Sequence, residues 1–392
     1  MPATCMQDVV IVGGGVIGLS LAYELAGQGV SCALFDQGAL GQESSWAGAG
    51  ILVPGQALDS GTPEARLRAA SHRRWPDWSA RLREETGIDN GFRRCGGLEV
   101  RCGGSPEALL EEVAHWKREG EQVTPLHGTS LWECEPHLSR QVTTAYRLPE
   151  LGQVRNPRHV KALIAACLRR GVQMHEGTPC WGFDRAGERI TAIRTSQGRM
   201  AAGQFVVASG AWSAALLADC GAAPRIRPLR GQMVLLKMPR CPIQHVVNVG
   251  PRYLVPRDDG RTLIGSTEEI VGFDKRTTAA GLAGLLEFGL QVVPLLAEAQ
   301  VERNWAGLRP QSADGLPYLG RVPGVENLFV AAGHFRAGLQ LSPITAELLA
   351  QVLLGRNTTL PLPPFAVDRP TPALGSDWQP WGAPDQSREG SS

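Results

Sequence analysis

The sequence of 392 residues lacks the features of several large protein classes. No apolar run is long enough to span a membrane, and the first residues, MPATCMQ, lack the basic-then-apolar layout of a secretory signal. Its nine cysteines are scattered without a C-x-x-C pair or a His-rich ligand spacing, which argues against a disulfide framework and a metal site. The net charge of +1 provides no excess for binding nucleic acid. We therefore expect a reduced cytoplasmic protein with no metal, membrane span or nucleic-acid partner.

What the sequence does contain is a dinucleotide-binding pattern near its start. Val9 to Val12 is an apolar run typical of a buried parallel strand, and Gly13, Gly15 and Gly18 follow it in G-x-G-x-x-G spacing. From Ile17 the residues are mostly apolar helix formers. The first glycine permits the tight turn, the second lets a pyrophosphate approach the backbone, and the third lets the helix pack on the strand. This order predicts a strand, a turn and a helix that hold a nucleotide.

An acidic residue ends the next predicted strand. Val30 to Phe35 leads into Asp36, at about the distance expected for an acid that accepts both ribose hydroxyls of an adenosine. Such an acid favours FAD or NAD over NADP, and the alternative is a doubly wound domain that binds no nucleotide. Gly41 to Pro54, GQESSWAGAGILVP, is too rich in glycine for a core strand and too apolar for a linker.

That segment resembles the S-x-A-x-G-[MIL]-L loop beneath the flavin in the glycine oxidase branch of the D-amino-acid oxidase superfamily. Most of the chain is similar to the same family, except about residues 55–150 and the tail; the similar blocks are GQVRNPRHVKAL, RGQMVLLK, YLVPRDDGRTLIGST, WAGLRPQSADGLPYLG and GHFRAGLQLSP. The resemblance implies FAD as the cofactor. The FAD is expected to be non-covalent, because the sarcosine oxidase relatives tether flavin through a cysteine after the block matching 307–320, and no cysteine follows Cys241.

The length and the 43% hydrophobic content suit two domains. With the resemblance, they predict an α/β fold in which an FAD-binding Rossmann-like domain is interleaved with an antiparallel-sheet substrate domain. The FAD-binding domain is expected over 1–85, 146–225 and 310–366, the substrate-binding domain over 86–145 and 226–309, and a disordered tail over 367–392. Asn156 is expected to cap a helix opened by Pro157, and Ser342 one opened by Pro343. A homo-oligomer is left open.

Three residues carry the expected chemistry. Arg309 lies in the apolar setting NWAGLRP and needs an anionic partner; the matching arginine of the family forks onto the substrate α-carboxylate, and the alternative is a buried structural salt bridge. Tyr253 matches a tyrosine that helps to hold the carboxylate, or else packs within a sheet. Arg336 matches a side chain near the reacting centre, with an exposed loop arginine as the alternative. Arg225, Arg227 and Arg230 are expected on a solvated edge, with a binding patch as the alternative.

The resemblance also implies a set of cofactor contacts, in which His334 belongs to the contact surface and is not a general base. The expected contacts are Gly13, Gly15, Val16, Ile17, Gly18, Asp36, Gln37, Ser44, Ser45, Ala49, Gly50, Ile51, Cys180, His334, Phe335, Arg336, Ala337, Gly338, Leu339 and Gln340. The chain departs from the family at Ala337, where asparagine is common, and at Glu268, where an apolar residue is common. Glu268 could repel a carboxylate, contact the amine or point to solvent.

The activity implied is FAD-dependent oxidative deamination of glycine and other small amino acids, such as sarcosine and small D-amino acids. The products would be the keto or glyoxylate acid, ammonia and hydrogen peroxide, formed by hydride transfer to flavin N5 with dioxygen as the acceptor. In many bacteria such a reaction feeds thiazole synthesis for thiamin. The alternatives are a D-amino-acid or sarcosine dehydrogenase that uses a quinone or carrier, and a non-catalytic flavin-binding subunit.

Overall fold

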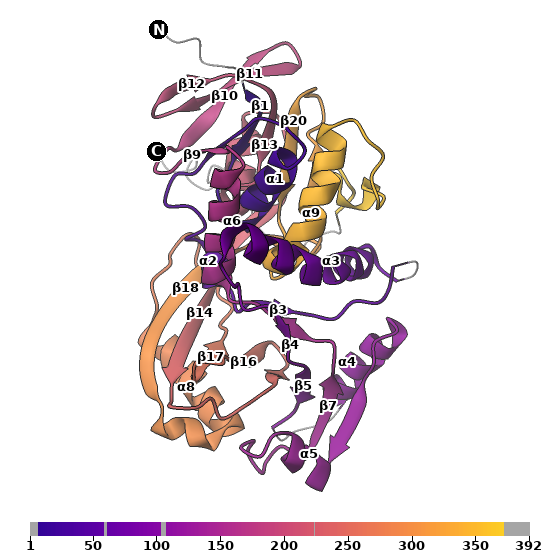
Figure 1. The fold of residues 1–392 in the computed structure, drawn as a ribbon, viewed down its shortest axis with the longest axis vertical. Helices are drawn as coiled ribbons and strands as arrows, with labels where there is room; N and C mark the ends of the chain where they lie inside the picture. The colour runs from indigo at the N-terminus through magenta and orange to yellow at the C-terminus, as the bar shows by residue number, and fades with distance from the viewer. Residues whose placement is uncertain (1–6, 59–60, 103–106, 223, 372–392) are drawn as a thin grey trace, which may run out of the picture.

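The computed structural model describes residues 7–58, 61–102, 107–222 and 224–371. Within these ranges the chain forms two large sheets, one in the upper and one in the lower half of Figure 1, and each takes strands from distant parts of the sequence. This arrangement confirms the predicted α/β fold with an interleaved, mainly antiparallel sheet.

The upper sheet has six strands in the order β19-β20-β13-β1-β2-β9, and all neighbours are parallel except β19 with β20. Its strands are β1 (Gln7–Val12), β2 (Cys32–Phe35), β9 (Gln173–His175), β13 (Ala202–Val207), β19 (Tyr318–Arg321) and β20 (Leu328–Ala332). Strand β20 therefore lies in the same sheet as β1, although more than three hundred residues separate them in the sequence.

Both faces of the upper sheet are covered, which explains why its first strand is apolar throughout. Val9 and Ile11 pack among helices, whereas Val10 and Val12 pack toward a small antiparallel sheet made of β10, β11 and β12. The helices on the first face are α1 (Val16–Ala26), α3 (Pro63–Thr86), α6 (Asn156–Arg169) and α9 (Gly338–Leu353), and the small sheet consists of β10 (Cys180–Ala186), β11 (Arg189–Thr195) and β12 (Gly198–Met200).

The lower sheet has eight strands in the order β18-β14-β17-β16-β15-β5-β7-β6, and only the β15–β5 pair is parallel. Its strands are β5 (Gly97–Val100), β6 (Thr124–His127), β7 (Thr144–Leu148), β14 (Ile226–Lys237), β15 (Val246–Val249), β16 (Arg252–Pro256), β17 (Arg261–Gly265) and β18 (Gln300–Ser312). Helices α4 (Glu107–Arg118), α5 (Thr129–Cys134) and α8 (Ala279–Val292) belong to this half of the molecule.

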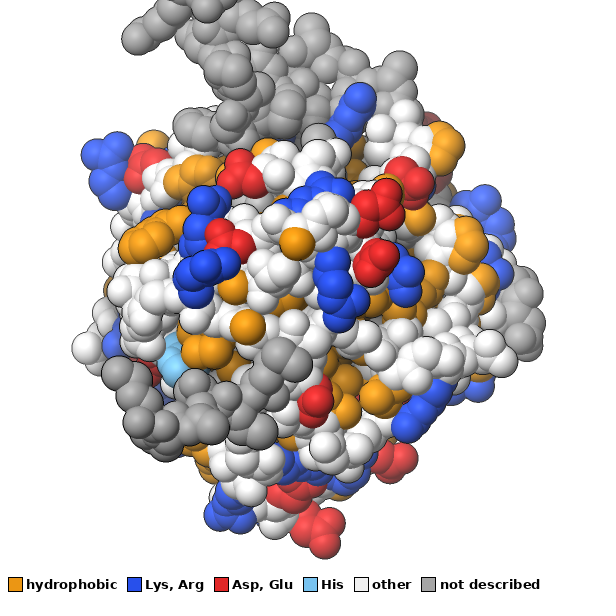
Figure 2. Space-filling view, turned by 90° about the horizontal axis from the view of Figure 1, so that it is seen from above, with side chains coloured by type: hydrophobic (Ala, Val, Ile, Leu, Met, Phe, Trp, Pro, Cys, Tyr) orange, Lys and Arg blue, Asp and Glu red, His pale blue; other side chains and the backbone are white. Residues whose placement is uncertain are grey.

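A third small sheet lies between the two halves in Figure 1. It pairs β3 (Ile51–Leu52), β8 (Gly152–Gln153) and β4 (Arg93–Arg94). The remaining elements are the helices α2 (Ser44–Ala47) and α7 (Ser213–Ala218) and the 3₁₀ helices η1 (Gly210–Trp212), η2 (Pro294–Glu298) and η3 (Pro363–Phe365). Figure 2 shows that basic, acidic and apolar side chains are interspersed on the upper face of the molecule.

Two expected helix starts are wrong. Helix α6 already includes Asn156, whose side chain makes no capping hydrogen bond and instead donates from Nδ2 to the Ser45 carbonyl at 2.8 Å. Helix α9 begins four residues before Ser342, so Pro343 lies inside it. Since Pro343 has no N–H to donate, the Leu339 carbonyl accepts from the Ser342 hydroxyl instead, at 2.9 Å.

The expectation for Arg230 is also wrong. Its side chain is only 5% exposed and forms ion pairs with Glu269 and with Asp274, the latter at 3.2 Å, so it does not lie on a solvated edge. A basic residue on a strand can bury its charge where two acids on a neighbouring segment face it.

Some strands and contacts extend across the expected domain boundaries. Strand β7 spans the boundary placed at 146, and β18 spans the one placed at 310. Beyond 367, Arg369 pairs with Asp314 at 2.7 Å and lies over the Tyr318 ring. Residues 372–392 of the expected tail lie outside the described residues, and the division into segments stays a prediction.

Candidate active site

A cavity of about 790 Å³ is lined by residues of both large sheets and the loops around them. Every residue expected to contact the cofactor lines it except Gly18, and so do Arg309 and Tyr253. Residues separated by more than three hundred positions in the sequence therefore share one cavity. The described residues include no helix long and apolar enough to cross a membrane, and no group of three or more His, Cys, Asp or Glu residues that could hold a metal.

At one end of the cavity, the glycine turn brings the start of α1 against the sheet. Gly13 has a φ of +117°, and a Cβ there would overlap the Ala208 backbone; a Cβ at Gly18 would overlap the Gly13 carbonyl oxygen. Gly18 thus allows α1 to pack closely without lining the cavity itself. The N–H groups at the start of this eleven-residue helix are suited to a pyrophosphate.

Asp36 closes the turn from the other side. Its carboxylate accepts the Gly14 N–H at 2.7 Å and the Gly38 N–H at 2.8 Å. Burial raises the pKa of this carboxyl group. A carboxylate with two backbone donors keeps lone pairs for further donors, so Asp36 can still accept a ribose hydroxyl within the cavity.

The small-residue loop from Ser44 to Ile51 is held from three sides. The Ser45 hydroxyl accepts the Val16 N–H at 2.8 Å, Asn156 donates to the Ser45 carbonyl, and the Trp305 indole N–H donates to the Ala47 carbonyl at 3.0 Å. These bonds tie the loop to α1, α6 and β18. The loop's small side chains leave space in the cavity, which is why a segment this apolar and rich in glycine is neither a core strand nor a linker.

Asn156 is a cavity residue that sequence reasoning missed, because its position before Pro157 is typical of a helix cap. Its Oδ1 is buried and has no hydrogen-bond partner among the described residues. A buried acceptor is costly when it is left unpaired, so this atom favours a ligand with a donor. Together with the glycine turn and Asp36, it fits FAD, whose adenosine and pyrophosphate would lie along the turn and whose ring system would lie toward the 44–51 loop.

Arg309 lies on β18, in the wall formed by the lower sheet. Its guanidinium donates to the Thr267 carbonyl at 3.2 Å and to the Ser266 hydroxyl, and a Cβ at Gly231 would overlap it. No carboxylate among the described residues lies within 4.0 Å of it. Arg309 therefore does not form the buried structural salt bridge that was the alternative. Arg309 is a partly buried cation whose neighbours are neutral acceptors.

Tyr253 lies on the same wall, on β16. Its hydroxyl is 3.5 Å from the Met233 sulfur, a weak acceptor, and Tyr253 is paired across the sheet with Gly265, the residue before Ser266. The cross-strand register therefore brings the tyrosine toward the atoms that hold Arg309. Because thioether sulfur accepts weakly, the phenolic proton is available to a stronger acceptor in the cavity.

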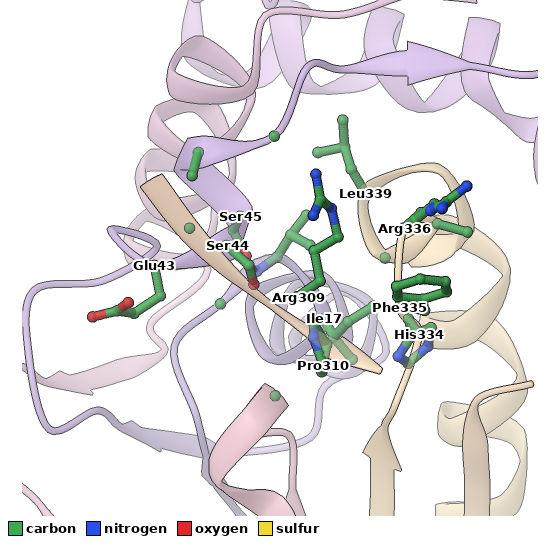
Figure 3. A pocket seen from close by; sticks show the side chains of 18 of the residues that line it. Ile17, Glu43, Ser44, Ser45, Arg309, Pro310, His334, Phe335, Arg336 and Leu339 are labelled. Atoms are coloured by element: carbon green, nitrogen blue, oxygen red, sulfur yellow. Dashed lines mark hydrogen bonds between the residues drawn. The ribbon is translucent and has the colours of Figure 1, made fainter. Parts of the chain in front are cut away.

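The loop before α9 completes the cavity, and Figure 3 shows it across from Ser44 and Ser45 with Arg309 between them in this view. The Phe335 N–H donates to the Pro310 carbonyl at 2.9 Å, which attaches the loop next to Arg309. Phe335 has a φ of +50°, a strained conformation for a residue other than glycine. Arg336 is 52% exposed at its side chain and forms an ion pair with Glu268.

His334 is buried beneath this loop. Its Nε2 is 3.1 Å from the Thr345 hydroxyl, and burial lowers the pKa of the imidazole to about 3. The ring is therefore neutral at physiological pH and already has a partner. This setting suits a residue that supports the loop better than one that removes protons.

A further part of the cavity wall comes from the region that carried no recognisable motif. These residues include Arg68 of α3, Glu99 of β5, and Glu112, His115 and Trp116 of α4, and Asn248 of β15 lies beside them. No local pattern distinguishes them from ordinary surface or strand residues. Only the pairing of β5 with β15 brings Glu99 into the cavity beside Asn248.

Comparisons with known proteins agree with this geometry. The family model described as FAD dependent oxidoreductase matches residues 8–352. Glycine oxidase of Pseudomonas putida is 36% identical over 361 residues, which cover 92% of this chain and 98% of that protein. The bifunctional protein ThiO/ThiG of a Synechocystis species is 33% identical over 370 residues, which cover 93% of this chain and 54% of that protein.

Among solved structures, the crystal structure of glycine oxidase from Geobacillus kaustophilus matches with a TM-score of 0.89 and 35% identity, over 94% of this chain and all of that chain. The chain is therefore a member of the FAD dependent oxidoreductase family, in its glycine oxidase branch.

Proposed function

We propose that this protein is an amino-acid oxidase that acts on glycine and other small amino acids, such as sarcosine and small D-amino acids. The observation that carries the proposal is Arg309, a cation that lines the cofactor cavity without an acidic partner among the described residues. A guanidinium in this setting binds a planar carboxylate through two parallel hydrogen bonds. The α-carboxylate of an amino acid is such a group.

The side chains of the wall orient the substrate. Arg309 holds the carboxylate, and Tyr253 donates its hydroxyl to the same group in place of the weak contact with Met233. Fixing the carboxylate at the wall places the α-carbon toward the cofactor side of the cavity, next to the loop that leads into α9. His334 remains neutral and supports the loop, so no protein base is assigned.

When bound, FAD supplies the two-electron oxidation of the substrate carbon–nitrogen bond. The balanced reaction converts a primary amino acid, water and dioxygen into a keto acid, ammonia and hydrogen peroxide; glycine yields glyoxylate. Sarcosine yields glyoxylate and methylamine, because its nitrogen carries a methyl group. We assign the reaction to the cytoplasm, because all eight cysteines among the described residues are free thiols. The likeness to ThiO/ThiG proteins supports a role in thiazole synthesis for thiamin.

The test is a panel of amino acids offered to the purified holoprotein under air, with hydrogen peroxide as the readout. We expect peroxide with glycine, sarcosine and small D-amino acids, and loss of the yellow flavin absorbance when the same compounds are added without oxygen. Anaerobic bleaching without peroxide under air would identify a dehydrogenase. No bleaching with any member of the panel would contradict the proposed function.

A further inference from the structure

The charges around the cavity are unevenly paired. Three arginines line it, and two of them are paired with acids: Arg68 pairs with Glu119 at 2.6 Å and with Glu64 at 3.3 Å, and Arg336 pairs with Glu268. Of these three arginines, only Arg309 has no acid within 4.0 Å among the described residues. In its present arrangement the cavity thus offers one unpaired guanidinium to an anion.

Acids outnumber arginines along the same walls; the acids are Asp36, Glu43, Glu64, Glu99, Glu112 and Glu268. Glu99 is buried and accepts from Asn248 at 2.7 Å. Burial and the nearby charge of Glu112 raise the pKa of Glu99 to about 8, which indicates a wall that disfavours negative charge. A second carboxylate on a substrate would meet the same penalty unless a cation were free to receive it.

The residues on either side of Glu268 are bonded to strand β14. Glu269 forms an isolated β-bridge with Arg230, and the Gln232 N–H donates to the Thr267 hydroxyl at 2.9 Å. The Glu269 side chain pairs with the buried Arg230, whereas Glu268 lines the cavity and pairs with Arg336. The same short segment therefore bonds to Arg309 through Ser266 and Thr267, and to Arg336 through Glu268.

We propose that Glu268 is a specificity-determining residue that occupies Arg336 and so leaves Arg309 as the single carboxylate site of the cavity. Amino acids with one carboxylate are accepted, and dicarboxylic amino acids are discriminated against. This inference rests on the proposed function, because it names the substrate class of the same site. It gives a role to Glu268, one of the two positions where this chain departs from its family.

The test replaces Glu268 by Gln, which removes the charge and keeps the shape, and by Met, which also removes the hydrogen bonds. We measure kcat/KM for glycine and iminodiacetate, and the dissociation constants of acetate and malonate from the absorbance change of the bound flavin. In both variants the preference for the dicarboxylic over the monocarboxylic compound should rise by up to about fivefold, the scale of one charge pair in a partly exposed site. Glu302→Gln is the matched control, because Glu302 pairs with Arg261 at 2.8 Å and does not line the cavity.

The double variant E268Q/R336Q identifies the second carboxylate site. If Arg336 is that site, the gain for malonate and iminodiacetate disappears in the double variant. A gain that survives there, or an unchanged preference in E268Q and E268M, overturns the inference. The acetate and malonate titrations do not depend on turnover, so a failure of the proposed function, seen as no amino-acid oxidation by the parent protein, is distinguishable from a failure of this inference.

Discussion

At the scale of single residues, the cavity distinguishes Arg309 from the other arginines by its partners. Its guanidinium passes so close to Gly231 that a Cβ there would displace it, and it donates to a carbonyl and a hydroxyl. Neutral acceptors hold the side chain in place without cancelling its charge. A charge-assisted fork onto an anion is the interaction that this arrangement leaves available.

Replacing Arg309 by Ala should therefore lower kcat/KM for glycine by on the order of a hundredfold or more, since each charge-assisted hydrogen bond contributes about 1.5 to 3 kcal/mol. Lysine should restore little, because it keeps the charge and loses the planar fork. Steady-state kinetics and the flavin content of each variant are the measurements. Arg276→Ala is the control, because Arg276 is 86% exposed and pairs with Asp274.

Flavin content should stay at the parent level in Arg309→Ala, since the nucleotide end of the cavity lies at the glycine turn and Asp36. A variant that oxidises glycine nearly as well as the parent would show that the carboxylate binds elsewhere. A colourless, unfolded variant would show that Arg309 is structural.

At the scale of elements, the cofactor side of the cavity depends on how the 44–51 loop is attached to three neighbours. The start of α1, the start of α6 and β18 each contribute one hydrogen bond to it. Asn156 has a double role, because its Nδ2 holds the loop while its Oδ1 lies buried in the cavity without a partner among the described residues. The first turn of α6 thereby couples loop position to cofactor binding.

Asn156→Ala should raise the dissociation constant of FAD by about tenfold or more, because two hydrogen bonds worth roughly 1 kcal/mol each are lost. The measurement is a fluorescence titration of the apoprotein with FAD. Asn304→Ala, on the outer part of β18, is the control and should bind FAD like the parent. Equal affinities for parent and Asn156→Ala would mean that the loop is held without this side chain and that its Oδ1 meets no cofactor donor.

At the scale of the whole molecule, residues of both large sheets line the cofactor cavity, and we expect the flavin there to be held without a covalent bond. Cys180 is the cysteine that lines the cavity among the described residues; its thiol lies 3.5 Å from the Gly182 carbonyl, and burial raises its pKa. A thiol with a raised pKa is a poor nucleophile, since the thiolate is the reactive form. We therefore expect the flavin to be held by shape, hydrogen bonds and the helix N-terminus.

Precipitation of the holoprotein with acid should accordingly release all of its flavin into the supernatant. The measurement compares the flavin absorbance of the supernatant with that of the dissolved pellet. Flavin that stays with the pellet, and that Cys180→Ala then sets free, would contradict a non-covalent cofactor.

Acid should also destabilise the fold through two buried histidines. Burial lowers the pKa of His159 and of His334 from 6.5 to about 3. Between these values the unfolded chain binds a proton that the folded chain excludes, so stability falls as pH falls below about 6.5, by roughly 1.4 kcal/mol per pH unit for each group. Urea unfolding of the apoprotein at pH 7 and pH 5.5 measures this loss, and His334→Gln should reduce it; an equal slope in the variant would show that His334 titrates normally.

Sequence alone determined those features that depend on residues close together in the chain. The strand, glycine turn and helix at the start follow from apolar periodicity and glycine spacing. The chain's similarity to its family pointed to Arg309, Tyr253 and the segment 334–340, all of which line the cavity. Local patterns are also where prediction failed: Asn156 and Ser342 each precede a proline, as helix caps do, yet both lie within helices. A capping pattern describes what a residue can do, and tertiary contacts decide whether it does so.

Only the tertiary structure decided which groups far apart in the sequence bond to one another. Asn156 reaches Ser45 across 111 positions, Arg336 pairs with Glu268 across 68, and Asn248 meets Glu99 across 149. Nothing in the local sequence sets these distances, because they result from how the strands of two sheets are ordered. The sequence therefore supplies the charged and polar groups. The packing of the sheets determines that Arg336 is paired with an acid and that Arg309, among the described residues, is not. The reason is that electrostatic pairing depends on distances that only the folded chain defines.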